Sequence, residues 1–208
     1  MITTFIALAI SYLVGSIPAS YLIAKSMMNI DIRKHGSGNV GATNVLRTAG
    51  RLPAILSLLS DVLKGVVAVT LLTSFFFQFS IIIDRELFQL LMGFAVICGH
   101  IWPIFLRFKG GKGVATTTGV LIVLCPKIVG IVAIIFLAVI AFTRYVSLGS
   151  VLASISLPMV AAYDGRSVKL VLFCITLCIL SCYKHKSNIV RIINKEEHKI
   201  GQKVGTDL

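Results

Sequence analysis

The chain has 208 residues, of which 57% are hydrophobic and 13% are charged, and its formal net charge is +12 at pH 7. This composition excludes an ordinary soluble domain and is typical of a polytopic membrane protein. The charge does not indicate nucleic-acid binding, because the basic residues lie in loops beside apolar segments, as the positive-inside rule describes. We therefore expect contact with membrane lipid and no nucleic-acid partner.

The apolar residues form five long segments that we predict to be helical, at residues 3–23, 54–80, 88–106, 114–142 and 147–183. The first lacks a basic leader and a clear small-residue cleavage site, so we expect a retained membrane helix and not a signal peptide. As one helix, the last segment would be about 55 Å long, nearly twice a hydrocarbon core. It also carries Asp164 and Arg166 at its middle, which predicts a hairpin of two helices.

Segment 114–142 contains Pro126 and Lys127, which either kink one tilted helix or separate two short ones. Loop 24–52 is basic and is placed in the cytoplasm. With segment 147–183 split, the basic tail 184–208 reaches the same side only if segment 114–142 is split as well. We therefore predict an all-α polytopic membrane protein with seven transmembrane helices, some short or half-spanning. The prediction places the N-terminus outside and the C-terminus in the cytoplasm, in a single integral-membrane domain over residues 1–208.

The first polar block is GSGNVGATN at residues 36–44, with Arg47 three residues later. Glycine lets backbone N–H groups approach an anion, and arginine can bind a phosphate through two parallel hydrogen bonds. An ordinary Gly/Asn connector is the alternative. The candidate site residues are Ser37 and Arg47, together with the anion-binding set Gly36, Gly38, Asn39, Gly41, Thr43 and Asn44.

Asp61 and Lys64 lie inside the second apolar segment at i, i+3 spacing. An ionisable pair within a membrane is a functional hypothesis, and a structural ion pair is the alternative. His100, at the end of the third segment, could be satisfied by a neighbouring helix, and we assign it no catalytic role.

The second polar block is KGGKG at residues 109–113. It resembles a phosphate cradle but not a Walker A motif, because Leu106 stands where that motif needs glycine and Gly113 where it needs Ser or Thr. ATP is therefore not indicated. A basic cytoplasmic turn is the alternative, although a plain turn needs only one glycine. The candidate residues are Lys112 and the phosphate-binding set Gly110, Gly111 and Gly113.

The tail places His185, Asn188 and Ile192 near one helix face. This segment either lies on anionic lipid as a juxtamembrane amphipathic helix or supplies hydrogen bonds from His185 and Asn188 to a polar substrate. The sequence has no HxxxxD pair, no GxSxG elbow and no metal-ligand cluster, and its five cysteines lack CxxC spacing. We expect no metal and no cofactor, so an enzyme built on this chain must use a substrate already activated for attack.

Three blocks in this order, GSGNVGATNVLR (36–47), GH-x2-P-x-FLRFKGGKGVAT (99–116) and H-x2-NI-x-R (185–191), resemble the acyl-phosphate:glycerol-3-phosphate acyltransferase family, PlsY. The resemblance implies a seven-helix enzyme of the bacterial inner membrane whose active site faces the cytoplasm. Such an enzyme transfers an acyl group from acyl phosphate to the first hydroxyl of glycerol 3-phosphate, and it yields lysophosphatidic acid and inorganic phosphate. It also implies a possible functional link to a soluble enzyme that forms acyl phosphate.

By position, the resemblance implies that Ser37 and Arg47 are the important serine and arginine of the first motif. It also implies that Gly110, Gly111 and Gly113 bind acyl phosphate and that Lys112 binds its phosphate. His185 and Asn188 match the third motif, and Glu197 matches its structural glutamate. Lys195 departs from the pattern, since many members have glycine there. We expect Gly119 and Ala115 to make room for the acyl chain. A small-anion transporter and a lipid-binding scaffold are the alternatives from other classes.

Overall fold

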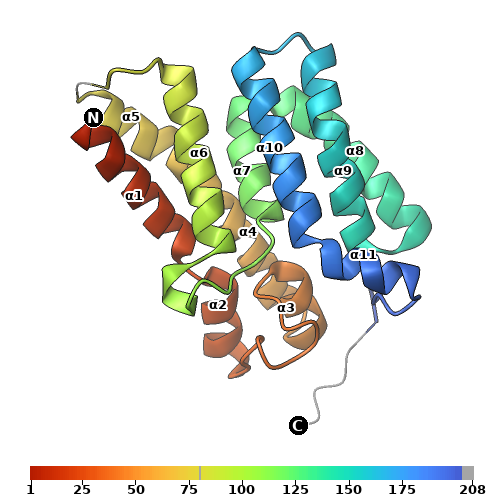
Figure 1. Ribbon diagram of the computed structural model, residues 1–208. Helices are drawn as coiled ribbons and strands as arrows, with labels where there is room; N and C mark the ends of the chain where they lie inside the picture. The colour runs from red at the N-terminus through yellow and green to blue at the C-terminus, as the bar shows by residue number, and fades with distance from the viewer. Residues whose placement is uncertain (80, 203–208) are drawn as a thin grey trace. The chain divides into compact units, whose positions relative to one another are not determined.

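The computed structural model describes residues 1–79 and 81–202, and every regular element within them is helical (Figure 1). The all-α prediction is therefore confirmed. The described chain forms two compact units, residues 1–124 and residues 125–202. The prediction of a single functional domain over residues 1–208 stays a prediction, and positions 203–208 of the predicted tail lie outside the described residues.

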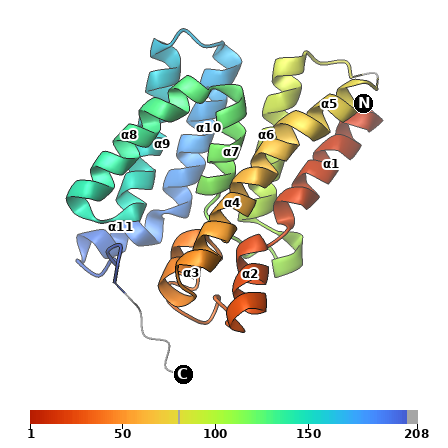
Figure 2. The same cartoon turned by 180° about the vertical axis from the view of Figure 1, so that it is seen from behind.

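The first unit consists of α1 (Ile2–Ser16), α2 (Ala19–Met28), α3 (Ala42–Thr48), α4 (Arg51–Val67), η1 (Ala68–Leu72), α5 (Thr73–Phe77), α6 (Arg85–Ile101), η2 (Ile104–Leu106) and α7 (Val114–Leu124). Helix α1 packs along α6, and α4 packs along α7 (Figures 1 and 2). The π-helical turn η1 joins α4 and α5 into one continuous span from Arg51 to Phe77 (Figure 2). The first apolar segment was predicted as one helix, but it is broken at Ile17 and Pro18, because proline cannot donate the helical hydrogen bond.

Glycines allow these helices to pack at close range. A Cβ atom at Gly15 would overlap the Val96 carbonyl, and one at Gly119 would overlap the Val62 carbonyl. Gly119 therefore serves the contact between α7 and α4, so the expectation that it makes room for an acyl chain is wrong.

The second unit consists of α8 (Pro126–Thr143), α9 (Val146–Tyr163), α10 (Val168–Lys184) and α11 (Lys186–Ile193), and α9 packs against both α8 and α10. Pro126 is the first residue of α8, a position where its missing N–H costs nothing. Segment 114–142 is thus two helices. The hairpin predicted for 147–183 is also confirmed, and its turn is held by hydrogen bonds to Asp164 from Lys127 (2.5 Å) and Arg166 (2.9 Å).

Five helices in the described chain are long and apolar enough to cross a membrane. Helix α10 qualifies as a sixth when it is taken with α11, from which it is separated by a 54° bend. Helix α7 has 11 residues and a length of about 16 Å, roughly half a hydrocarbon core. Large side chains such as Leu137 and Phe142 on α8 are exposed, as contact with lipid requires. The protein is an integral membrane protein, and the count of seven crossings and the orientation stay predictions.

Candidate functional site

Asn44 organises the first glycine-rich loop. Its side chain is 1% exposed, and its Oδ1 accepts a hydrogen bond from the Ser37 N–H at 2.9 Å. Its Nδ2 donates to the carbonyls of Ile32 (2.9 Å) and His35 (3.1 Å). Gly36 lies at φ +60°, and a Cβ atom there would overlap Asn44 Oδ1. The amide of Asn44 therefore shapes the loop, and the position of Ser37 follows from it.

The other predicted residues of this loop surround that frame. Gly38 has φ +69°, and Gly41 immediately precedes α3. Ser37 is exposed, Asn39 and Thr43 are half-buried, and Arg47 is half-buried in the last turn of α3. Beneath them lies an apolar cluster made of Ala24, Ile30, Ile32, Val40, Val45, Ala49, Ala54 and Leu106. Because Leu106 lies just before the KGGKG loop, this cluster joins the two predicted phosphate-binding loops within one unit.

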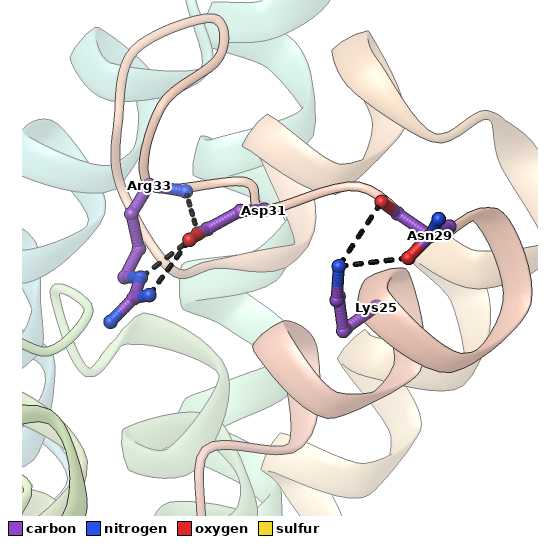
Figure 3. A network of polar contacts seen from close by, with 4 residues as sticks. All are labelled: Lys25, Asn29, Asp31 and Arg33. Atoms are coloured by element: carbon purple, nitrogen blue, oxygen red, sulfur yellow. Dashed lines mark hydrogen bonds and ion pairs between the residues drawn. The ribbon is translucent and has the colours of Figure 1, made fainter.

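A polar network fixes the chain where it enters the first loop (Figure 3). Lys25 donates to the Asn29 side chain at 2.8 Å, and Asp31 accepts from the Arg33 guanidinium at 2.7 and 2.9 Å. The hydrogen bond from the Arg33 side chain lowers the pKa of Asp31 to about 2, so this carboxylate stays ionised. Lys25 and Arg33 are therefore engaged with groups of the loop itself.

The second loop folds back onto the C-terminal end of α6. The N–H groups of Gly110 and Gly111 donate to the carbonyls of Ile101 (3.2 Å) and His100 (3.1 Å). A Cβ atom at Gly110 would overlap the His100 carbonyl, and one at Gly111 would overlap the His100 ring. Gly113 requires φ +84°. Gly110 and Gly111 thus serve close packing, which places Lys112 just before the N-terminus of α7, where a helix favours an anion.

Asp61 and Lys64 form a buried ion pair at 2.8 Å beside the break between α1 and α2. Ser20 donates to Asp61 at 3.2 Å, and Lys64 Nζ lies 3.5 Å from the Ile17 carbonyl. His100 Nδ1 is 3.4 Å from Asp61 Oδ1, so this histidine has the interhelical partner that we expected. Through Lys64, the pair thus contacts the backbone at the break between α1 and α2. This is the structural ion pair that was the alternative to a functional role. A small pocket here is lined by this cluster and by residues of both loops, Val40 and Gly111.

The third motif lies in the second unit, at the bend between α10 and α11. His185 is 2% exposed, and its Nδ1 is 2.8 Å from the Ser181 carbonyl. A carbonyl only accepts hydrogen bonds, so Nδ1 carries a proton and donates it to this carbonyl. Asn188 is 4% exposed and lies on α11. The two side chains are buried and not on the lipid-facing surface of the helix.

Glu197 is the centre of a buried network. Its Oε1 accepts from Asn188 (2.7 Å) and Ser147 (2.8 Å), and its Oε2 accepts from Arg191 (2.8 Å). Glu196 is exposed. Glu197 thus connects α9 to α11 through hydrogen bonds. A structural role of this kind is what the resemblance implies for Glu197. Sequence reasoning assigned no role to Ser147 or Arg191, although Arg191 belongs to the third sequence block.

The stability of this network should depend on pH. Burial raises the pKa of Glu197, but the hydrogen bonds from Asn188, Ser147 and Arg191 outweigh burial and lower the pKa below its usual value of 4.5. The stabilisation is therefore fully present above that value and is lost as the pH falls through the folded-state pKa. We expect Glu197→Gln to be less stable by about 1–3 kcal/mol at neutral pH. Its thermal midpoint in detergent should fall less on acidification than that of the wild type, and equal falls would contradict this account.

Lys195 has φ +61°, a left-handed conformation that favours glycine. The departure from the family pattern therefore has a cost in this chain. We expect Lys195→Gly to stabilise the protein by about 0.5–1 kcal/mol, measured as a higher thermal midpoint. Glu196→Gly is the control, since its neighbouring position lacks a positive φ. A midpoint that falls in both variants would show that the conformation is not strained.

Comparisons with known proteins agree with this geometry. A family model described as glycerol-3-phosphate acyltransferase matches residues 5–195. Proteins named glycerol-3-phosphate acyltransferase from Desulforudis audaxviator and Syntrophomonas wolfei are 43% and 45% identical over 198 and 196 residues. These alignments cover 95% and 94% of this chain and 96% of each relative.

Two crystal structures of PlsY (YgiH), described as an integral membrane glycerol 3-phosphate acyltransferase, have the same fold. The glycerol 3-phosphate form has a TM-score of 0.85 at 35% identity and covers 95% of this chain and 96% of its own. The lysophosphatidic acid form has a TM-score of 0.81 at 34% identity, with 95% of each chain covered. The chain described here therefore belongs to the glycerol-3-phosphate acyltransferase family and is an acyltransferase of the membrane-integral kind.

Proposed function

We propose that the protein transfers an acyl group from acyl phosphate to the sn-1 hydroxyl of glycerol 3-phosphate. The products are lysophosphatidic acid and inorganic phosphate, in an early step of bacterial phospholipid synthesis. The observation that carries the proposal is the shared packing of the two glycine-rich loops, which are joined through Val40 and Leu106. Arg47 lies on α3, the helix that follows the first loop, and Lys112 lies in the second loop. Two such cations suit a reaction in which both substrates carry a phosphate.

In the proposed reaction, the hydroxyl oxygen of glycerol 3-phosphate bonds to the carbonyl carbon of acyl phosphate. The bond from that carbon to the bridging oxygen breaks, and the phosphate leaves with the electron pair and takes up the hydroxyl proton. Arg47 and Lys112 neutralise the two phosphates, and Ser37 contacts substrate from the exposed part of the first loop. Proximity and charge stabilisation supply the rate, because the mixed anhydride is already electrophilic.

The geometry refines the roles of three predicted residues. Asn44 shapes its loop through three hydrogen bonds, and the amides of Gly110 and Gly111 donate to α6. We propose that these three position the anion-binding groups and do not themselves bind phosphate.

We place this activity in the bacterial cytoplasmic membrane, with the site facing the cytoplasm. The positive-inside rule supports that orientation for the basic first loop. We also propose a functional link to a soluble enzyme that forms acyl phosphate, since the proposed reaction consumes that donor.

The donor can be tested directly with purified protein in detergent. We expect labelled glycerol 3-phosphate to be converted to lysophosphatidic acid when palmitoyl phosphate is present. Palmitoyl-CoA at the same concentration should give no product. Equal conversion with palmitoyl-CoA would contradict the proposed donor.

The absence of a side-chain base can be tested at His185. We expect His185→Ala to be slower by about 2–10-fold, the loss of one hydrogen bond between neutral groups. Its pH–rate profile should keep the shape of the wild-type profile, because the leaving phosphate takes the proton. A pH-dependent limb that disappears in this variant alone would identify His185 as the base.

A further inference from the structure

We infer that His100 is a positioning residue, which is held in place by buried Asp61 and in turn fixes Gly111 and therefore Lys112. The inference rests on the proposed role of Lys112 in binding a substrate phosphate. It gives a function to a histidine and an intramembrane carboxylate that the proposed reaction does not otherwise use.

Asp61 is fixed from several sides. Lys64 Nζ lies 2.8 Å from its Oδ1, and Ser20 donates a hydrogen bond to its Oδ2 at 3.2 Å. His100 Nδ1 lies 3.4 Å from Oδ1. The side chains of Asp61, Lys64 and His100 are 3%, 8% and 7% exposed. Because a buried charge without its partners is costly, such a cluster tolerates few alternative arrangements. The His100 ring is thereby oriented from the side of α4.

The opposite side of the His100 ring faces the glycine loop. For a Cβ atom built on Gly111, the three nearest atoms all belong to this ring, with Cε1 at 3.0 Å, Cδ2 at 3.1 Å and Nε2 closer still. The Gly111 N–H also donates to the His100 carbonyl at 3.1 Å. One residue therefore holds Gly111 through both its ring and its backbone. Because Lys112 follows Gly111 directly in the chain, the orientation of the His100 ring determines the backbone position of Lys112.

Gly110 differs from Gly111 in a way that supplies a control. A Cβ atom at Gly110 would meet the His100 and Ile101 carbonyls and the Pro103 ring, and none of these is the His100 side chain. Replacing the His100 side chain should therefore make room for alanine at position 111 but not at position 110.

The test is a set of double variants assayed for kcat and for the KM of both substrates. We expect Gly111→Ala to reduce kcat/KM by about 10–100-fold, since overpacking forces the loop to shift. His100→Asn keeps an amide N–H toward Asp61 but removes the part of the ring above Gly111. In the His100→Asn background, Gly111→Ala should cost less than about threefold, whereas Gly110→Ala should cost as much as it does in the wild type.

A positioning role also predicts which kinetic constant changes. His100→Asn should raise, by about tenfold, the KM of the same substrate whose KM is raised by Lys112→Gln, with little change in kcat. If His100→Asn does not fold, His100→Ala must give the same rescue of Gly111→Ala.

Three outcomes would overturn the inference. These are no rescue of Gly111→Ala, equal rescue of Gly110→Ala, or a loss confined to kcat with both KM values unchanged in His100→Asn. If Lys112→Gln itself leaves both KM values and kcat unchanged, two proposals fail together. These are the role of Lys112 in binding phosphate and the role of His100 in positioning Lys112. A normal defect in Lys112→Gln without rescue overturns the inference alone, so the two failures are distinguishable.

Discussion

Arg47→Lys is expected to lower kcat/KM by about 100–1000-fold although the formal charge is unchanged. Arginine can hold a phosphate through two parallel N–H groups, whereas lysine offers a single charged point on a flexible stem. Arg47 lies one helical turn after Asn44, whose buried amide fixes the loop. A rigid loop beside the guanidinium is the setting in which losing the fork should matter most.

Arg51→Lys is the matched control for this experiment. Arg51 is exposed at the start of α4, four residues after Arg47, and we expect its replacement to change kcat/KM by less than about twofold. Both variants should show wild-type thermal midpoints. Full activity in Arg47→Lys would show that charge alone is needed at that position, and the bidentate contact would have to be abandoned.

Lys112→Gln should lower kcat/KM by about 1000-fold, mostly through the KM of one substrate, because it leaves the phosphate of that substrate without its cation in a site that excludes water. Lys112 is half-buried between a loop packed on α6 and the N-terminus of α7. Glutamine keeps the length of the side chain and its capacity to donate but removes the charge.

Lys109→Gln is the comparison within the same loop. Lys109 is exposed and three residues earlier, and we expect less than a threefold change when its charge is removed. Equal losses at positions 109 and 112 would indicate a general attraction of anions by the basic loop. That result would contradict a specific contact at Lys112.

The helices could largely be predicted from the sequence, because hydrocarbon thickness limits the length of a span. The excessive length of segment 147–183 and the presence of Asp164 and Arg166 within it indicated the turn that separates α9 from α10. Pro126 likewise marked the start of α8. The break in the first segment was not predicted, although Pro18 gave a signal, since proline and its preceding residue both disfavour helix.

The residues of the loops could be predicted, but not all of their roles. Asn44 was predicted to bind an anion, and its amide instead bonds to carbonyls up to twelve residues away. Similarly, nothing in the sequence indicates that Gly111 rests on His100 or that Ser147 reaches Glu197 fifty residues later. These contacts depend on how helices pack, and a sequence motif records only which residues are near in the chain.

The most direct test of the proposed chemistry is the release of inorganic phosphate from palmitoyl phosphate by the purified protein. We predict that release requires glycerol 3-phosphate and matches the lysophosphatidic acid formed, one molecule for one. Phosphate release that ignores the acceptor would contradict acyl transfer and indicate hydrolysis. Movement of labelled glycerol 3-phosphate into proteoliposomes with no acylated product would contradict it in favour of transport.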